Sequence, residues 1–159
     1  MIINKCNILK VGVVAFGLVG AGLGIWLMNG GIKQAEAADM VVYKSPTCGC
    51  CAAWIEHIEA SGITVDVKNA YDLSPIKAKM GVPDQLESCH TAVIDGYTIE
   101  GHVPATDIKR LLSERPDARG LSVPGMPVGS QGMEQDGEKD PFVTVLFGDQ
   151  GYQAFARHN

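Results

Sequence analysis

Residues 47–51 are Thr47-Cys48-Gly49-Cys50-Cys51, a run that places three of the chain's five cysteines within four positions. The run follows residues 40–44, a short apolar and β-branched segment with the composition of a buried strand. Ser45-Pro46 ends that strand, and Thr47 is a suitable N-cap for an amphipathic helix that ends near Gly62. We therefore expect the thiols in the first turn of a helix. Free backbone N–H groups and the positive end of the helix dipole stabilise thiolates there, and thiolates bind metals and attack disulfides.

The N-terminal part of the chain has the features of a targeting segment. Lysines occur before an uncharged apolar run over residues 11–28, and Ala35-Glu36-Ala37 supplies the small residues of a cleavage site. The apolar run is at the lower limit for crossing a bilayer, which needs about 20 residues. Residues 1–37 are therefore expected to be a signal peptide, with an uncleaved N-terminal membrane anchor as the alternative. Either one exports residues 38–159.

The exported part is long enough for one domain with a modest core. The formal net charge of the chain is −5, and no basic stripe occurs, so nucleic acid is not an expected partner. Contact with a membrane is expected only if the leader stays uncleaved.

Clustered thiols in an exported protein normally indicate structural disulfides. Here Cys50 and Cys51 are adjacent, and a Cys48–Cys50 bridge closes too small a loop to restrain much of the unfolded chain. Cys6 precedes the apolar run and lies outside the candidate site. The spacing therefore argues against a structural disulfide framework.

Beyond the first helix, alternation, turn signals and caps predict five more elements before Pro116. They are a strand over 63–67, a short helix over 75–80, strands over 91–94 and 97–101 joined by Asp95-Gly96, and a helix that begins after Pro104. The resulting order is strand, helix, strand, helix, strand, strand, helix, which is the minimal thioredoxin-like α/β arrangement. In this arrangement the loop before the third strand lies beside the start of the first helix, so Cys89 should face the other three thiols.

The C-terminal part begins with a long Gly- and Pro-rich segment. Residues 120–134 have no helical or strand period and contain Met126 and Met133. A long loop in a small domain is usually functional or disordered. Residues 142–147 and 152–155 then predict a hairpin that could extend the sheet. The predicted fold is therefore a thioredoxin-like α/β domain over residues 38–159 with a Gly/Pro/Met loop and a C-terminal hairpin.

The clustered sulfur atoms favour a copper site, because thiolates and thioethers are soft ligands that prefer Cu(I). Structural zinc sites usually use two spaced C-x2-C pairs, whereas a C-x-C-C run crowds its ligands as thiolate-bridged multinuclear copper does. Iron–sulfur clusters also prefer wider spacings. The candidate metal ligands are Cys48, Cys50, Cys51, Cys89, Met126 and His102.

Thiol–disulfide exchange is the alternative chemistry. Cys48 and Cys51 have the C-x-x-C spacing of exchange enzymes, but Cys50 interrupts it with a third thiol. Such enzymes usually place a cis proline just before the third strand, where this chain has Ser88-Cys89-His90. A thiol in place of a substrate-binding proline suits a metal ligand better than a peptide-binding groove, so metal binding is the favoured hypothesis.

Several other residues remain open between a ligand role and a structural one. His90 and His102 are each either a ligand or a structural histidine, with His90 able to point to the opposite face of its strand. Met126 and Met133 are either ligands or gap-filling core residues, and ligation suits Met126 better. The sequence places His57 on the surface, Trp54 in the core and His158 in the C-terminal tail. None of the three is expected to bind a metal.

Four separate motifs resemble one known family. They are residues 43–51 with Trp54, residues 88–91, residues 101–105 and residues 120–134. Together they closely resemble the CopG-type family of periplasmic copper-resistance proteins. The resemblance implies a thioredoxin-like fold whose cysteine cluster binds several copper ions, with other periplasmic copper-handling proteins as partners. It also implies a role in copper handling that extends to Cu(I)/Cu(II) interconversion.

The chain departs from the family pattern at Gln131, where a proline is expected. This change should alter the stiffness of the loop more than the ligation of a metal.

Overall fold

The computed structural model describes residues 37–158. These residues belong to one compact unit. The expected leader, residues 1–37, lies outside the described residues apart from Ala37. Within residues 37–158, no helix has the length and apolar character needed to cross a membrane.

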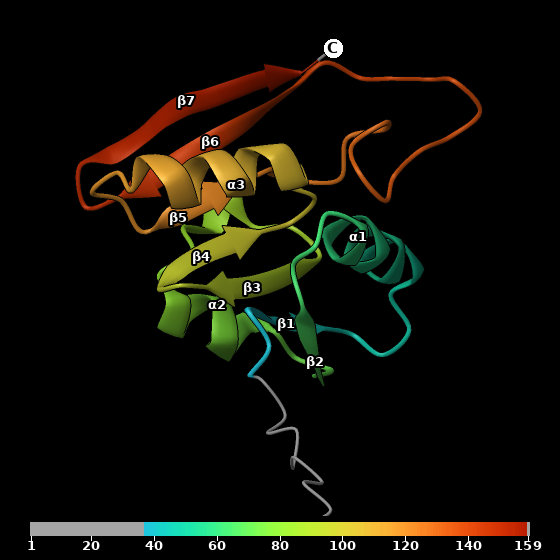
Figure 1. The fold of residues 1–159 in the computed structure, drawn as a ribbon, viewed down its shortest axis with the longest axis horizontal. Helices are drawn as coiled ribbons and strands as arrows, with labels where there is room; N and C mark the ends of the chain where they lie inside the picture. Colours follow the sequence, from blue (N-terminus) through green and yellow to red (C-terminus); the bar gives the residue numbers. More distant parts are fainter. Residues whose placement is uncertain (1–36, 159) are drawn as a thin grey trace, which may run out of the picture. The chain divides into compact units, whose positions relative to one another are not determined.

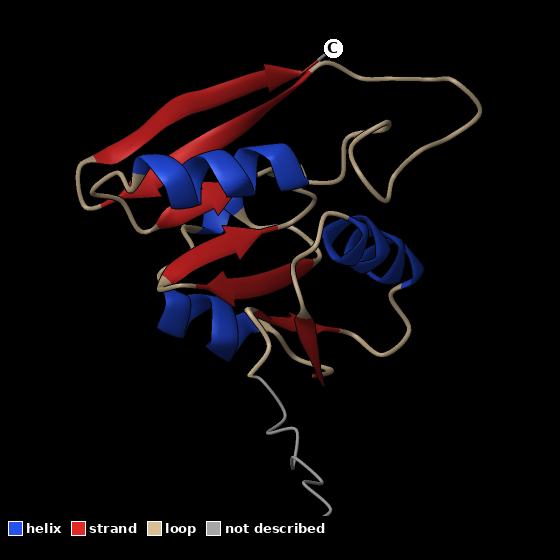
Figure 2. Cartoon of the chain, viewed as in Figure 1, coloured by secondary structure: helices blue, strands red, loops and turns tan. Residues whose placement is uncertain are grey.

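Seven strands and three α-helices make up the described fold (Figures 1 and 2). In chain order they are β1 (Met40–Lys44), α1 (Gly49–Ala60), β2 (Val65–Asn69), α2 (Ser74–Met80), the 3-10 turn η1 (Asp84–Leu86), β3 (His90–Ile94), β4 (Tyr97–Glu100), α3 (Ala105–Glu114), β5 (Gly120–Ser122), β6 (Phe142–Gly148) and β7 (Gly151–His158). The strands form one mixed sheet in the order β2-β1-β3-β4-β5-β6-β7. The predicted α/β class is confirmed, and the elements from β1 to α3 follow the predicted order.

The pairing register of β1 and β3 brings the residues of the candidate site to the same end of these two strands. β1 pairs in parallel with β2 through the α1 crossover and antiparallel with β3. Lys44, the last residue of β1, is therefore opposite His90, the first residue of β3. The start of α1 and the loop that contains Cys89 consequently lie side by side.

The main core lies between the sheet and helices α1 and α3. Trp54 and Ile58 of α1 and Ile108 and Leu111 of α3 are fully buried. Fully burying a large apolar side chain contributes about 1.5–3 kcal/mol, so these residues anchor both helices. Trp54 also donates its Nε1 hydrogen to the Val103 carbonyl at 2.9 Å. The prediction that Trp54 belongs to the core is confirmed.

The C-terminal half differs from the sequence prediction at β5. Residues 120–122 form a strand that is parallel to β4 and antiparallel to β6, and β6 pairs in turn with β7. A three-residue strand is too short to show a period in the sequence. Gly120 is required there, because a Cβ atom would overlap the backbone of Thr98. The predicted hairpin therefore does extend the sheet, and β5 attaches it.

Candidate metal centre

The start of α1 is built around Cys48, not Thr47. Cys48 has an extended backbone and is the N-cap, and its Sγ accepts the Cys51 N–H at 3.3 Å. The prediction of Thr47 as the N-cap is wrong by one residue, because the Thr47 hydroxyl lies 3.1 Å from the hydroxyl of Ser45. The three thiols nevertheless occupy the cap and the first turn, as the sequence indicates.

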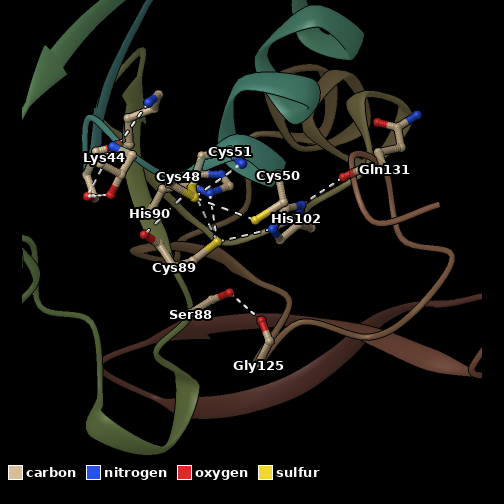
Figure 3. Close-up of a disulfide and its surroundings, with 12 residues drawn as sticks. Lys44, Cys48, Cys50, Cys51, Ser88, Cys89, His90, His102, Gly125 and Gln131 are labelled. Atoms are coloured by element: carbon tan, nitrogen blue, oxygen red, sulfur yellow. Dashed lines mark hydrogen bonds between the residues drawn. A yellow bond between two sulfur atoms is a disulfide. The ribbon is translucent and has the colours of Figure 1, made fainter. Parts of the chain in front are cut away.

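Four sulfur atoms converge at this helix start (Figure 3). The Sγ atoms of Cys48, Cys50, Cys51 and Cys89 all lie within 4.8 Å of one another. Cys48 Sγ is 3.5 Å from Cys50 Sγ, and Cys51 Sγ is 3.6 Å from Cys89 Sγ. The prediction that Cys89 faces the other three thiols is confirmed.

Two of the four cysteines are bonded to each other. Cys48 and Cys51 form a disulfide, and Cys50 and Cys89 are free and partly buried. The bridge joins residues three positions apart, so it restrains little of the unfolded chain and is not a structural staple. Burial, together with the neighbouring Cys50, raises the pKa of the Cys89 thiol to about 12. Without a metal, Cys89 therefore stays a protonated thiol at neutral pH.

His102 is oriented as a lone-pair donor toward the sulfur atoms. Its Nδ1 lies 2.8 Å from the carbonyl oxygen of Gln131, and its Nε2 lies 3.1 Å from Cys89 Sγ. A carbonyl can only accept, so Nδ1 carries the proton and Nε2 presents its lone pair to the cluster. Burial lowers the pKa of His102, which favours the neutral ring. Metal-binding histidines are commonly held in this way by a backbone carbonyl.

His90 lies on the cluster side of β3, so its side chain does not point away from the site. The ring is fully buried, packs at 4.3 Å between centroids on Trp54, and places Nδ1 3.3 Å from Cys89 Sγ. Within residues 37–158, its Nε2 has no hydrogen-bond partner. Burial, with His102 nearby, lowers the pKa of His90 well below its usual value. Cys89, His90 and His102 thus offer three donor atoms within 4.8 Å of one another, and the two histidine nitrogens add to the four sulfur atoms.

The two loop methionines lie beside the first turn of α1. Met126 and Met133 line an open hollow together with Cys50. Met126 is 53% exposed, so it is not a gap-filling core residue. The structure therefore places both methionines around the same hollow as one of the four clustered cysteines, Cys50.

The methionine loop is fixed against α1 by contacts that the sequence did not reveal. Gly132 has φ +83°, and a Cβ atom there would lie 2.6 Å from the Trp54 nitrogen and 2.8 Å from the Cys50 carbonyl oxygen. Glu134 accepts the Gly132 N–H at 2.9 Å and pairs with His57 at 2.9 Å. His57 is exposed, as predicted, and it also holds the loop.

A buried carboxylate fixes the chain on both sides of Cys89. Glu100 of β4 accepts the Ser88 N–H at 2.6 Å and the Thr91 hydroxyl at 2.6 Å, and it pairs with Lys77 of α2. Burial raises the pKa of Glu100, while Lys77 acts in the other direction. This network fixes the residues on both sides of Cys89 and His90. No local sequence signal indicates this network, because Lys77 and Glu100 lie 23 positions apart.

Comparisons with known proteins match this chain to copper resistance proteins. Two solved structures, entitled "Copper resistance protein copG", Form 2 and Form 1, are 44% and 45% identical to it, with TM-scores of 0.73 and 0.71. The first match covers 78% of this chain and 100% of the other, and the second covers 75% and 95%. The chain belongs to the CopG family. The resemblance inferred from its four motifs is thus confirmed.

A protein-family model described as "Protein of unknown function, DUF411" matches residues 86–133 of this CopG family member. The matched part contains Cys89, His90, His102 and both loop methionines, whereas the Cys48–Cys51 run lies before it. No curated protein matches the chain.

Proposed function

We propose that this protein is a periplasmic copper-binding protein of copper resistance and homeostasis that holds Cu(I) in a multinuclear thiolate cluster. The observation that carries the proposal is the convergence of four cysteine sulfur atoms within 4.8 Å. The similarity to proteins entitled copper resistance protein supports the choice of metal. The proposed ligands are Cys48, Cys50, Cys51 and Cys89, with His102 and Met126 completing the coordination.

The donor set fits copper better than harder metals. Thiolate, thioether and imidazole together suit Cu(I), which is soft and singly charged. Several thiolates in a partly buried space repel one another unless cations neutralise them. Because each Cu(I) carries one charge, more than one ion is needed, and bridging sulfurs accommodate them at these short S···S distances.

The protein residues must change state to accept the metal. The Cys48–Cys51 disulfide has to be reduced before either sulfur can bind, and Cys89 has to lose its proton. His102 needs no such change, since its Nε2 already presents a lone pair toward Cys89.

The same cysteine pair supports a copper oxidoreductase activity. When the Cys48–Cys51 dithiol becomes the disulfide, it releases two electrons and two protons. Those electrons convert two Cu(II) ions to two Cu(I) ions, and the remaining thiols and histidines can hold the product. Other periplasmic copper-handling proteins are the proposed donors or acceptors of the metal.

The location and fold assignment belong to the same proposal. Residues 1–37 direct the chain out of the cytoplasm, either as a cleaved signal peptide or as an anchor. Residues 38–159 form the metal-binding domain, and its β1-to-α3 part, with the strand order β2-β1-β3-β4, is thioredoxin-like. Cell fractionation with mass analysis of the mature N-terminus tests the export and separates cleavage from anchoring.

An anaerobic Cu(I) titration against a competing chelator tests the central claim. The reduced wild-type protein should take up several copper ions, and Cys50→Ser and Cys89→Ser should each lower the uptake. His158→Ala is a matched control, because that histidine lies outside the cluster and binds Asp107. Wild-type protein without Cu(I) uptake, or cysteine variants with unchanged uptake, would refute the proposal.

A thiol–disulfide oxidoreductase is the second candidate function. It is favoured by the Cys48–Cys51 disulfide, which has C-x-x-C spacing at a helix start. In this case the metal-free protein should reduce insulin with a dithiol as the electron source, and Cys48→Ser should abolish the activity. An inactive wild-type protein removes this candidate.

A further inference from the structure

We infer that Gln131 is a positioning residue that fixes the orientation and tautomer of His102 by tying the methionine loop to the start of α3. This inference rests on the proposed metal site, in which His102 is a ligand. Gln131 itself does not face the sulfur atoms. It acts through two hydrogen bonds that point in different directions. Figure 3 shows the first of them, between His102 and the Gln131 carbonyl oxygen.

The first hydrogen bond involves the backbone of Gln131. Its carbonyl oxygen accepts the Nδ1 hydrogen of His102 at 2.8 Å. This contact places the proton on Nδ1 and leaves Nε2 as the acceptor, 3.1 Å from Cys89 Sγ. The tautomer of His102 therefore depends on where the carbonyl of residue 131 points.

The second hydrogen bond involves the side chain of Gln131. Its Oε1 accepts the backbone N–H of Ala105, the first residue of α3, at 2.8 Å. The N-cap of α3 is Pro104, which offers no side-chain acceptor to the helix. The first N–H groups of a helix need partners from outside it, so Gln131 supplies from the loop what the N-cap cannot.

The peptide unit between Gln131 and Gly132 is held at both ends. Its carbonyl bonds to His102, and its N–H donates to Glu134 at 2.9 Å. Gly132 packs directly on the backbone of α1, so the loop cannot slide along that helix. On the α3 side, the Gln131 side chain holds the loop through its hydrogen bond to Ala105. This bond stops the peptide unit from rotating away from His102.

Removal of the side-chain acceptor should therefore loosen His102 without touching any metal ligand. In Gln131→Ala the carbonyl remains, but its direction is no longer fixed by Ala105. Loss of a partner that orients a metal-binding histidine typically lowers metal affinity by about 10- to 100-fold, and this indirect tie should lie near the tenfold end. Gln131→Glu keeps a side-chain acceptor for the Ala105 N–H, so it should keep most of the wild-type Cu(I) affinity.

The decisive experiment is long-range ¹H–¹⁵N NMR of the His102 ring in metal-free, reduced protein, beside chelator-competition titrations of Cu(I). Wild type and Gln131→Glu should show the Nδ1–H tautomer. Gln131→Ala should show mixed or exchange-broadened tautomers and weaker Cu(I) binding. Gln150→Ala, in the turn between β6 and β7, is the matched glutamine control and should resemble wild type.

The inference is overturned if Gln131→Ala keeps a pure Nδ1–H tautomer, whatever its copper affinity. Should Gln131→Ala fail to fold, Gln131→Asn provides the same test with a shorter amide that cannot reach Ala105. The NMR measurement requires no metal. A wild-type protein that binds no copper would thus defeat the proposed function and still leave the tautomer result to decide the role of Gln131.

Discussion

Two neighbouring residues at the start of β3 face two very different buried clusters. Successive side chains of a strand point to opposite faces of the sheet. Thr91 therefore points toward α2, where it bonds Lys77 and Glu100. His90 points toward α1, where it contacts Trp54 and Cys89.

The two clusters differ in how completely their polar groups are paired. In the Thr91 cluster, a cation, a carboxylate and a hydroxyl bond one another, and the carboxylate also accepts the Ser88 N–H. In the His90 cluster, the free thiol of Cys89 lies against the rings of His90 and His102. Among the described residues, His90 Nε2 is the one buried side-chain nitrogen or oxygen without a partner. We call the fully paired Thr91 cluster closed and the His90 cluster open. Full pairing indicates a structural role, and an unpaired buried polar atom indicates a place for a ligand.

The largest expected effect comes from opening the closed cluster. Lys77→Met leaves the Glu100 carboxylate buried without its cation, and breaking a buried ion pair in this way costs about 3–5 kcal/mol. Urea unfolding of the metal-free protein should show this loss. The double variant Lys77→Met/Glu100→Leu should recover much of it, since it removes both charges. A loss below about 1 kcal/mol for Lys77→Met would mean that the network does not stabilise the fold.

The second effect concerns the open cluster and should appear in metal binding instead of stability. In Cys50→Ser a hard oxygen replaces a soft sulfur, so Cu(I) affinity should fall by about 100-fold or more. Cys50 is partly exposed and unbridged, so the free energy of unfolding of the metal-free protein should change by less than about 1 kcal/mol. Parallel chelator competition and urea unfolding measure both quantities. A large loss of stability would place Cys50 among the structural residues.

The third effect uses one substitution at two histidines to compare open and closed surroundings. His90→Phe removes an unpaired buried nitrogen and keeps an aromatic ring beside Trp54, so the metal-free protein should keep its stability or gain about 1 kcal/mol. His158→Phe breaks the bonds from His158 to Asp107 and Thr144 and should cost about 1–3 kcal/mol. Thermal or urea unfolding gives both values. Equal destabilisation of the two variants would mean that pairing of the histidine does not decide its contribution to stability.

The sequence predicted the open cluster better than the paired polar groups elsewhere in the fold. The thiols are short-range signals, because three of them lie in one helical turn, and the order of elements was enough to bring Cys89 to them. His158 was assigned no role, yet it bonds Asp107, which lies 51 positions away. Pairings over such distances depend on the register of strands and leave no local pattern.

Local geometry set a second limit on what the sequence could reveal. A sulfur atom took the N-cap position expected for Thr47, and three-residue β5 was too short to show a period. Gln131 was recognised as a departure from the family pattern. Its bonds to His102 and Ala105 could not be predicted, because they depend on how the loop crosses two helices.

The smallest expected effect tests how far the open cluster reaches into the methionine loop. Met126 is more than half exposed and lines the hollow beside Cys50, so its thioether can approach a bound ion only from the solvent side. A neutral thioether is a weaker ligand than a thiolate, so Met126→Leu should reduce Cu(I) affinity by less than about tenfold. Met80→Leu is the matched control, because Met80 packs against the smaller hydrophobic cluster away from the site. It should leave the Cu(I) affinity unchanged. A loss as large as that of Cys50→Ser would make the loop part of the cluster itself, and no loss would confine the site to the thiols and imidazoles.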